Sequence, residues 1–401
     1  MSTSPVPPAG RKVFLEERRL LKMAESAHAY VRGNTARFYE WLTSDAVPTN
    51  IPTGPPIWIC GDCHIGNLGP VADLEGKVEI QIRDLDQTVI GNPAHDLLRL
   101  GLSLAMAARS SDLPGMTTAL SIEVMIESYL QGLTGSKPKP SMAKIAPIEK
   151  VMRGALNRKW RHLAEERIED VEPNIPLGSK FWPLTKEERA QLVDLVESSD
   201  SSEQFRQLSR AKENEPIKVL DAAYWMKGCS SLGRLRYALL IGVGKKRNQR
   251  YRLIDIKEAT KALAPRAKKA QMPANNAERV VTGARHLSPF LGNRMVATAL
   301  GNKQVVVREL RPQDLKFEFD ELTQEEAIST AGLFATVVGK AHGRQLKPAI
   351  RSAWKRELKR TYSKSLDAPS WLWSGVVDLV AAHEASYLRH CRAYALSAEK
   401  G

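Results

Sequence analysis

The sequence has few cysteines, no long apolar run and no excess of glycine or proline. Its 4 cysteines among 401 residues are too few for a disulfide scaffold and are typical of a reducing compartment. No apolar run approaches the roughly 18 residues that cross a bilayer, and residues 1–19 contain no apolar signal core. The 26 glycines and 23 prolines exclude collagen-like and low-complexity chains. We therefore expect a cytoplasmic protein with no membrane span.

The composition that is present is typical of a folded protein with an uneven charge. Hydrophobic residues make up 43% and charged residues 26%, which excludes disorder for most of the chain and suggests two or three compact units. The net charge is +14, yet residues 51–130 carry −6 and the rest carries +20. This acidic segment indicates either a cation site that faces an anionic ligand or a solvated acidic face.

The pattern of apolar residues predicts a mixture of helices and strands. Helices are expected over 14–42, 96–109, 116–133, 141–172 and 276–287. Thr185 with Glu188, and Thr323 with Glu326, form capping boxes that begin two further helices. Strands are expected at 57–60, 78–82, 237–243, 250–257 and 305–307. We expect an α+β protein without internal repeats, in which a β-rich block over 213–322 lies within a largely helical chain.

Three short motifs carry the most specific signal. They are Gly61-Asp62-Cys63-His64-Ile65-Gly66-Asn67, then Arg83-Asp84-Leu85-Asp86, and finally Gly91-Asn92-Pro93-Ala94-His95-Asp96-Leu97. The first motif follows Cys60, where many relatives have histidine. This series resembles the phosphotransferase signature of the aminoglycoside and choline kinase-like superfamily, and so implies a protein kinase-like fold.

The resemblance assigns a role to each acidic or amide residue. Phosphoryl transfer needs a carboxylate that accepts the proton of the attacking hydroxyl, and oxygen ligands that hold Mg²⁺ against the phosphates. By the resemblance, Asp62 is the catalytic base, and Asn67 and Asp84 are the magnesium ligands. Two protein ligands suffice, because magnesium keeps waters and phosphates as its other ligands. Asp86 would assist, and Asp96 would fix the loop by hydrogen bonds.

A kinase also needs a glycine-rich turn and a lysine on a strand. The turn would be formed by Gly228, Ser230, Ser231 and Gly233, and Lys257 ends a strand that resembles the Val-Ala-Ile-Lys motif. The resemblance implies that these residues bind the phosphates of ATP and that Glu278 holds Lys257. Two residues depart from the kinase pattern. Ser230 stands in place of a middle glycine, and Asp255 stands where kinases place a small residue against adenine.

The motifs occur in an unusual order, because the catalytic loop precedes the lysine strand. We therefore expect a two-lobed, circularly permuted kinase-like fold. Residues 1–212 would form the helical catalytic lobe, 213–322 the β-rich nucleotide-binding lobe, and 323–401 the helices that complete the large lobe. One triphosphate must bridge the lobes, so Lys257 should lie within about 15 Å of Asp84.

The whole chain is similar to DUF2252, a family of bacterial proteins. The similarity runs through Lys22-Met23, Arg32-Gly33, the Asp62 loop, the Asp84 strand, Lys257-Glu258-Ala259, the run from Arg279 to Arg285, Arg308-Glu309-Leu310 and Ala341-His342. This family relationship predicts the fold better than it predicts the function.

The favoured function is an ATP- and Mg²⁺-dependent phosphotransferase that acts on an unknown hydroxyl acceptor. One alternative is a nucleotide-binding pseudokinase or a nucleotidyl transferase. Another is a basic nucleic-acid-binding or scaffolding protein, because residues 347–364 carry seven bases and one acid around Trp354; that helix could equally be a solvated face with Trp354 packed inward. Cys60, Cys63 and His64 also match a haem attachment motif or a partial zinc site. Neither leaves a role for Asn67 and Asp84.

Overall fold

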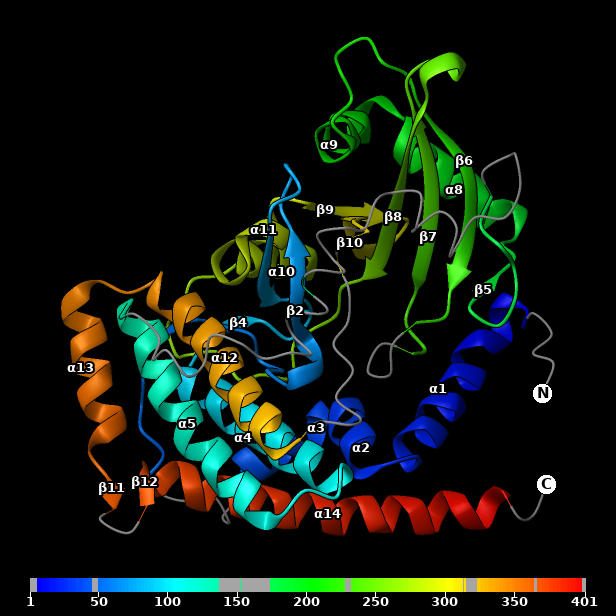
Figure 1. Cartoon of the computed structure of the whole chain (residues 1–401). Coiled ribbons are helices and arrows are strands. Elements are labelled where there is room, and N and C mark those ends of the chain that lie inside the picture. Colours follow the sequence, from blue (N-terminus) through cyan, green and yellow to red (C-terminus); the bar gives the residue numbers. More distant parts are fainter. Residues whose placement is uncertain are drawn as a thin grey trace.

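The computed structural model describes residues 6–44, 50–136, 152, 174–227, 232–312, 314, 323–363 and 366–398. The chain forms a part built around one large sheet and a part built from helices, with a gap between their ribbons (Figure 1). The expected α+β class is therefore confirmed. None of the helices in the described ranges is long and apolar enough to cross a bilayer.

The sheet has six antiparallel strands in the order β5-β6-β7-β8-β10-β9. Their bounds are β5 Phe181–Trp182, β6 Ile217–Trp225, β7 Arg236–Val243, β8 Arg250–Glu258, β9 Met295–Leu300 and β10 Lys303–Leu310. Helices α10 (Asn276–Leu287) and α11 (Pro289–Gly292) connect β8 to β9. Strand β7 is buried along its whole length, which is typical of a central strand covered on both faces.

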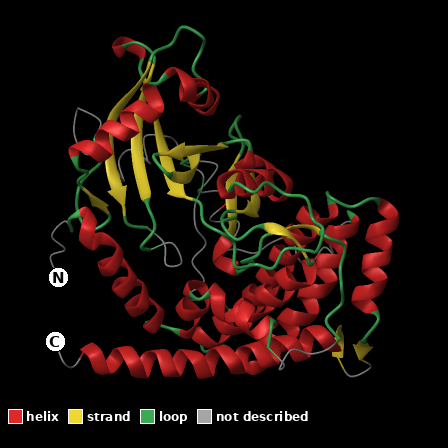
Figure 2. Cartoon of the chain, turned by 180° about the vertical axis from the view of Figure 1, so that it is seen from behind, coloured by secondary structure: helices red, strands yellow, loops and turns green. Residues whose placement is uncertain are grey.

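Helices α8 (Lys186–Glu197) and α9 (Ser199–Ser209) lie against the sheet, as the view from behind shows (Figure 2). Leu192 and Phe205 from these helices share one apolar cluster with Leu239 and Ile241 of the sheet. Strand β5 and helices α8 and α9 therefore pack with the sheet, although they precede residue 213.

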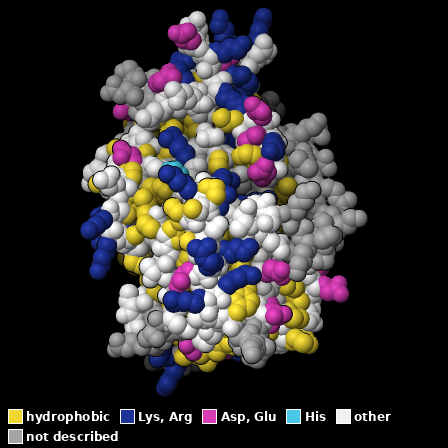
Figure 3. All heavy atoms as spheres, turned by 90° about the vertical axis from the view of Figure 1, so that its left-hand side faces the viewer, with side chains coloured by type: hydrophobic (Ala, Val, Ile, Leu, Met, Phe, Trp, Pro, Cys, Tyr) yellow, Lys and Arg dark blue, Asp and Glu magenta, His cyan; other side chains and the backbone are white. Residues whose placement is uncertain are grey.

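The helical part is built around α5 and α12, which run parallel to each other. Its helices are α4 Pro93–Ser110, α5 Gly115–Thr134, α12 Gln324–Gly343, α13 Pro348–Lys359 and α14 Ser370–Ala398. A small pair of strands, β11 (Tyr362–Ser363) and β12 (Leu366–Pro369), joins α13 to α14. Figure 3 shows the face that α13 covers, where basic and acidic side chains lie among hydrophobic ones.

Three helices, rather than the one helix expected over 14–42, form the N-terminal segment. They are α1 (Pro8–Ala24), α2 (Ala27–Gly33) and α3 (Thr35–Leu42). The breaks occur because Ser26 accepts a hydrogen bond from Ala29 N and Asn34 accepts one from Arg37 N, so each caps a new helix. Both predicted capping boxes are present. The helix expected over 141–172 falls outside the described residues, except for Met152.

The backbones of α5 and α12 touch, and this contact requires glycine. A Cβ at Gly339 would lie 2.2 Å from the carbonyl oxygen of Tyr129. We expect Gly339→Ala to lower the free energy of unfolding by about 1–3 kcal/mol, because the helices must separate. Gly115→Ala, where a Cβ meets nothing within 4 Å, is the control. Urea denaturation of both variants tests this, and equal stability would contradict the close approach.

Two short strand pairs place the acidic loops side by side. Strand β1 (Ile57–Ile59) pairs with β4 (Val89–Gly91), and β2 (Leu68–Ala72) pairs with β3 (Val78–Ile82). Loop 60–67, which includes the 3-10 helix η1 (Ile65–Asn67), joins β1 to β2, and loop 83–88 joins β3 to β4. The amide of Arg83 donates to the carbonyl of Asn67 at 2.7 Å. The pairing therefore brings the Asp62 motif and the Asp84 motif close together.

In the large sheet, a further 3-10 helix, η3 (Lys246–Asn248), joins β7 to β8.

Candidate functional site

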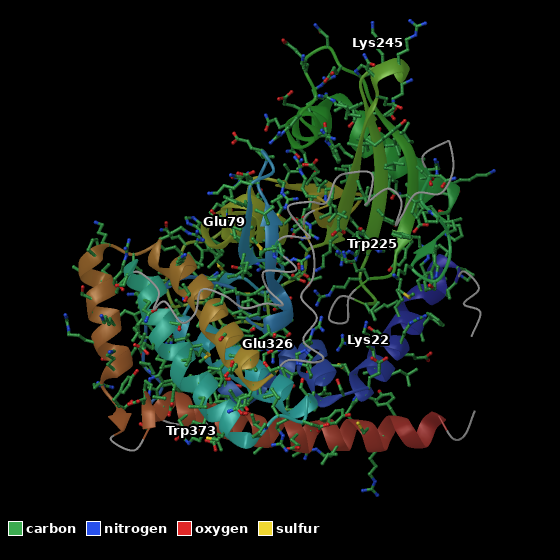
Figure 4. The ribbon with its side chains drawn as sticks, in the orientation of Figure 1. Lys22, Glu79, Trp225, Lys245, Glu326 and Trp373 are labelled. Atoms are coloured by element: carbon green, nitrogen blue, oxygen red, sulfur yellow. The ribbon has the colours of Figure 1, made fainter. Side chains whose placement is uncertain are left out.

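A cavity lies between the sheet and the two acidic loops. From the loops it is lined by His64, Asn67, Asp84 and Asp86, and from the sheet by Lys257 and Arg308, among others. Trp225 marks the end of the sheet that faces the helical part, whereas Lys245 lies at the far tip (Figure 4). The cavity therefore joins residues that are distant in the sequence.

Lys257 reaches from β8 to the loop after β3. Its Nζ lies 3.5 Å from Asp84 Oδ2 and also pairs with Asp86. The expected proximity of Lys257 and Asp84 is therefore met. Burial alone would raise the pKa of Asp84, but Lys257 and an amide of the Asp86 backbone hold that pKa well below its ordinary value. Burial and the nearby charge of Asp84 raise the pKa of Asp86.

Asn67 and Asp84 are suited to hold a magnesium ion. Both line the cavity. Asn67 Nδ2 donates to the carbonyl of Asp62 at 3.0 Å, which leaves the amide oxygen as the ligand atom. The low pKa of Asp84 keeps its carboxylate charged, as a hard cation requires. Within the described ranges no three His, Cys, Asp or Glu side chains gather at metal-binding distance, so a zinc site at Cys60, Cys63 and His64 gains no support.

Asp62 is buried directly beside the cavity, and other side chains hold both of its oxygens. Arg99 Nε donates to Oδ1 at 2.9 Å, and Thr35 Oγ1 donates to Oδ2 at 2.9 Å. His64 Nε2 lies 3.9 Å from Oδ2, and His64, not Asp62, is among the residues that line the cavity. Burial raises the pKa of Asp62, although Arg99 and Thr35 oppose the rise. A raised pKa suits a proton acceptor.

Asp96 braces the loop that carries Asp62. Its fully buried carboxylate accepts from the amides of Cys60 at 2.7 Å and Gly61 at 2.9 Å. His342 Nε2 lies 3.2 Å from the same carboxylate, and its Nδ1 lies 3.0 Å from the hydroxyl of Tyr129. The prediction that Asp96 fixes the loop is confirmed, and His342 has a structural place behind it.

The sheet side of the cavity carries a buried ion cluster. Arg236 binds Asp255 through Nε at 2.8 Å and through Nη2 at 2.5 Å, and Arg308 Nη2 lies 3.1 Å from the same carboxylate. The register explains the cluster, because Arg236 lies opposite Lys257, and Arg308 lies opposite Asp255. Residues that fit phosphates and a metal are therefore present. At Asp255, however, the surface is charged and not the apolar one that adenine contacts.

The glycine-rich turn is only partly described. Gly228, Ser230 and Ser231 lie outside the described residues. Gly233 has a φ of +89°, and a Cβ there would lie 3.3 Å from Cγ of Glu16, so this glycine turns the chain beside α1 and is not in the cavity wall.

Glu278 does not hold Lys257. It is exposed in the first turn of α10, and Lys257 forms ion pairs with Asp84 and Asp86 instead. The inward residue next to it is Arg279, which is buried and donates to backbone carbonyls, including that of Asp86 at 3.0 Å. An arginine in this place cannot pair with a lysine, so the carboxylate partner comes from the acidic loop.

Sequence reasoning missed Arg99 and Arg236. Arg99 is completely buried in α4, and the sequence does contain a signal for it. It is the only charged residue between Asp96 and Arg109 in an otherwise apolar helix, and a lone charge there must be paired. Arg236 begins a strand after a turn and gives no such signal.

The basic helix α13 packs its aromatic residue inward. Trp354 is buried, and its Nε1 donates to the hydroxyl of Tyr129 at 3.1 Å. Lys355, Arg356 and Lys359 are exposed. This arrangement agrees with a solvated helix face, since the tryptophan is not available to stack on a base.

Comparisons with known proteins give one relationship. No curated protein and no solved structure matches the chain. The sequence profile of one family, described as an uncharacterized protein conserved in bacteria, matches residues 15–393, which is nearly the entire chain. The chain therefore belongs to the DUF2252 family.

Proposed function

We propose that the protein is an ATP- and Mg²⁺-dependent phosphotransferase that acts on a hydroxyl group. The observation that carries this proposal is the ion pair between Lys257 and Asp84 in a cavity that Asn67 also lines. In protein kinases a strand lysine, a metal-binding aspartate and an asparagine serve the phosphates and the two metal ions. The same three residue types meet here.

The order of elements around Lys257 supports a kinase-like arrangement. A hairpin of β6 and β7 comes first, Lys257 lies on the next strand, β8, and helix α10 follows. Protein kinases carry the glycine loop, the lysine strand and helix αC in this order. The two-lobed, circularly permuted form of that fold remains part of the proposal.

The proposed step transfers the γ-phosphoryl group. The acceptor oxygen forms a bond to the γ-phosphorus while the bond from that phosphorus to the β–γ bridging oxygen breaks, so ADP leaves. The acceptor hydroxyl loses its proton to the carboxylate of Asp62. Lys257 offsets the negative charge of the phosphates, and Asn67 and Asp84 would hold Mg²⁺, which neutralises the remaining charge.

One observation favours a second candidate, which is nucleotide binding without transfer to a hydroxyl, or nucleotidyl transfer. Asp62 does not line the cavity, and its two oxygens each accept a hydrogen bond, from Arg99 and Thr35, which disfavours it as the group that takes a proton from an acceptor. ATP labelled at the γ- or the α-phosphate separates the candidates, because phosphoryl transfer puts the γ label on the acceptor, nucleotidyl transfer puts the α label there and releases the γ label in pyrophosphate, and binding alone moves neither label. If the protein transfers the γ-phosphoryl group, we expect Asp62→Asn to lose turnover and to bind ATP as the wild type does.

Thermal melting with ATP, with Mg²⁺ and with both tests the proposal. Ligand at 100 times its dissociation constant stabilises the folded state by about 2.7 kcal/mol, a shift that melting readily detects. We expect a full shift only when both are present. No shift with the pair would contradict the proposed site.

A further inference from the structure

A second candidate site lies on the side of the cavity next to the Asp62 loop. Arg32, at the end of α2, and His64 line the cavity together with Gly66 and Asn67. A Cβ at Gly66 would lie 3.0 Å from Arg32 Nε and 3.2 Å from His64 Cε1. The two side chains therefore both lie close to the backbone at Gly66, where a Cβ would crowd them.

Both side chains present buried nitrogen atoms that lack a partner. Among the described residues, Arg32 Nε and His64 Nδ1 are buried without a hydrogen bond, and His64 is only 4% exposed. Behind them His28, one helical turn before Arg32, has an unpartnered Nδ1 as well. A buried polar group without a partner costs about 1–3 kcal/mol, so three at one place indicate that something binds there.

The charge at this place favours an anion. Three other cations of the cavity wall pair with carboxylates, Lys257 with Asp84, and Arg236 and Arg308 with Asp255, and Arg83 donates to the backbone carbonyl of Asp314. Arg32 has no carboxylate within ion-pairing distance in the described part of the chain. Burial lowers the pKa of His28 to about 4, and the nearby charges of Arg32 and Arg99 add to this shift.

We propose that Arg32 and His64 form a subsite for an anionic group of the acceptor, which makes the acceptor an alcohol that also carries a carboxylate or a phosphate. The guanidinium fork binds either group through two parallel hydrogen bonds. His64 lies 3.9 Å from Asp62, so an anion held between Arg32 and His64 places a neighbouring hydroxyl beside the proposed base. The assignment to the acceptor rests on the proposed function. The anion subsite itself does not.

The test uses anions alone, with neither nucleotide nor magnesium. Melting of the full chain is followed in inorganic phosphate, in acetate and in chloride at equal ionic strength. We expect one of the first two to raise the melting temperature above chloride, and Arg32→Gln to weaken its apparent affinity at least tenfold. Arg32→Lys keeps the charge but loses the fork, and should fall in between. Stabilisation at tenfold lower concentration by phosphate than by acetate assigns a phosphate, and the reverse assigns a carboxylate.

Arg109→Gln is the matched control, because it removes one arginine of α4 from an exposed ion pair with Glu384 of α14. It should respond to the anions as the wild type does. An equal response of Arg32→Gln and Arg109→Gln, or no response of the wild type beyond chloride, overturns the subsite.

A second variant separates this proposal from the proposed function. In Asp84→Asn, ATP with Mg²⁺ should no longer raise the melting temperature, and the anion should still raise it. In Arg32→Gln, ATP with Mg²⁺ should still raise the melting temperature, and the effect of the anion should be lost. If the wild type responds to the anion but never to ATP with Mg²⁺, the phosphotransferase proposal fails and the anion subsite stands without its acceptor role.

Discussion

Asp84→Asn is expected to abolish the magnesium-dependent stabilisation by ATP. The wild type should gain about 2.7 kcal/mol with both ligands at 100 times their dissociation constants, and the variant should gain almost nothing from added Mg²⁺. The reason is that Asn keeps the shape of Asp84 but removes the charge of a metal ligand. Weak binding of ATP without Mg²⁺ should persist in the variant. Asp86 still pairs with Lys257 and so keeps this lysine in the cavity, where it can contact the phosphates.

Asp378→Asn is the matched control for this variant. Asp378 is exposed on α14. Its substitution by asparagine is the same isosteric change, made at a residue that does not line the cavity. The melting temperature of each unliganded variant is recorded first, so that a folding defect is not mistaken for lost binding. A full magnesium-dependent shift in Asp84→Asn would contradict its role as a metal ligand.

Arg99→Met is expected to lower the free energy of unfolding by about 3–5 kcal/mol, because it leaves the buried carboxylate of Asp62 without its charge partner. Arg99 is completely buried and donates to Asp62 and, at 2.6 Å, to the carbonyl of Val31. Methionine fills much of the same volume, so the loss reports the charge more than a cavity. Urea denaturation measures it.

The double variant Asp62→Asn with Arg99→Met shows whether charge is the cause. Removing both charges should recover part of the loss, with a coupling of about 1–3 kcal/mol between the two sites. Strictly additive losses would mean that Arg99 acts through its packing on Phe38, whose ring lies 5.5 Å away, and not through Asp62.

Local signals in the sequence were sufficient for many individual elements. The alternation of Val78, Ile80 and Ile82 predicts β3, and the helix expected over 276–287 is α10. The single helix expected over 14–42 is wrong, because side-chain caps at Ser26 and Asn34 outweigh a continuous apolar pattern. Apolar spacing alone does not report such caps.

The candidate site could be predicted only where a motif carries it. The phosphotransferase motifs placed Asp84 and Lys257 in one site, and the structure brings them within 3.5 Å. The partner of Lys257 could not be predicted, because it depends on how the acidic loop docks against the sheet. The same holds for Arg236 with Asp255, which meet through the register of β7 and β8.

The most direct test is a crystal structure of the protein grown with Mn²⁺ and a non-hydrolysable ATP analogue. Manganese replaces magnesium and is located by its anomalous signal. The proposed function predicts manganese bound to Asn67 and Asp84, with the phosphates next to Lys257. Manganese elsewhere, or a nucleotide bound away from Lys257, would contradict the proposal that this cavity is the site of phosphoryl transfer.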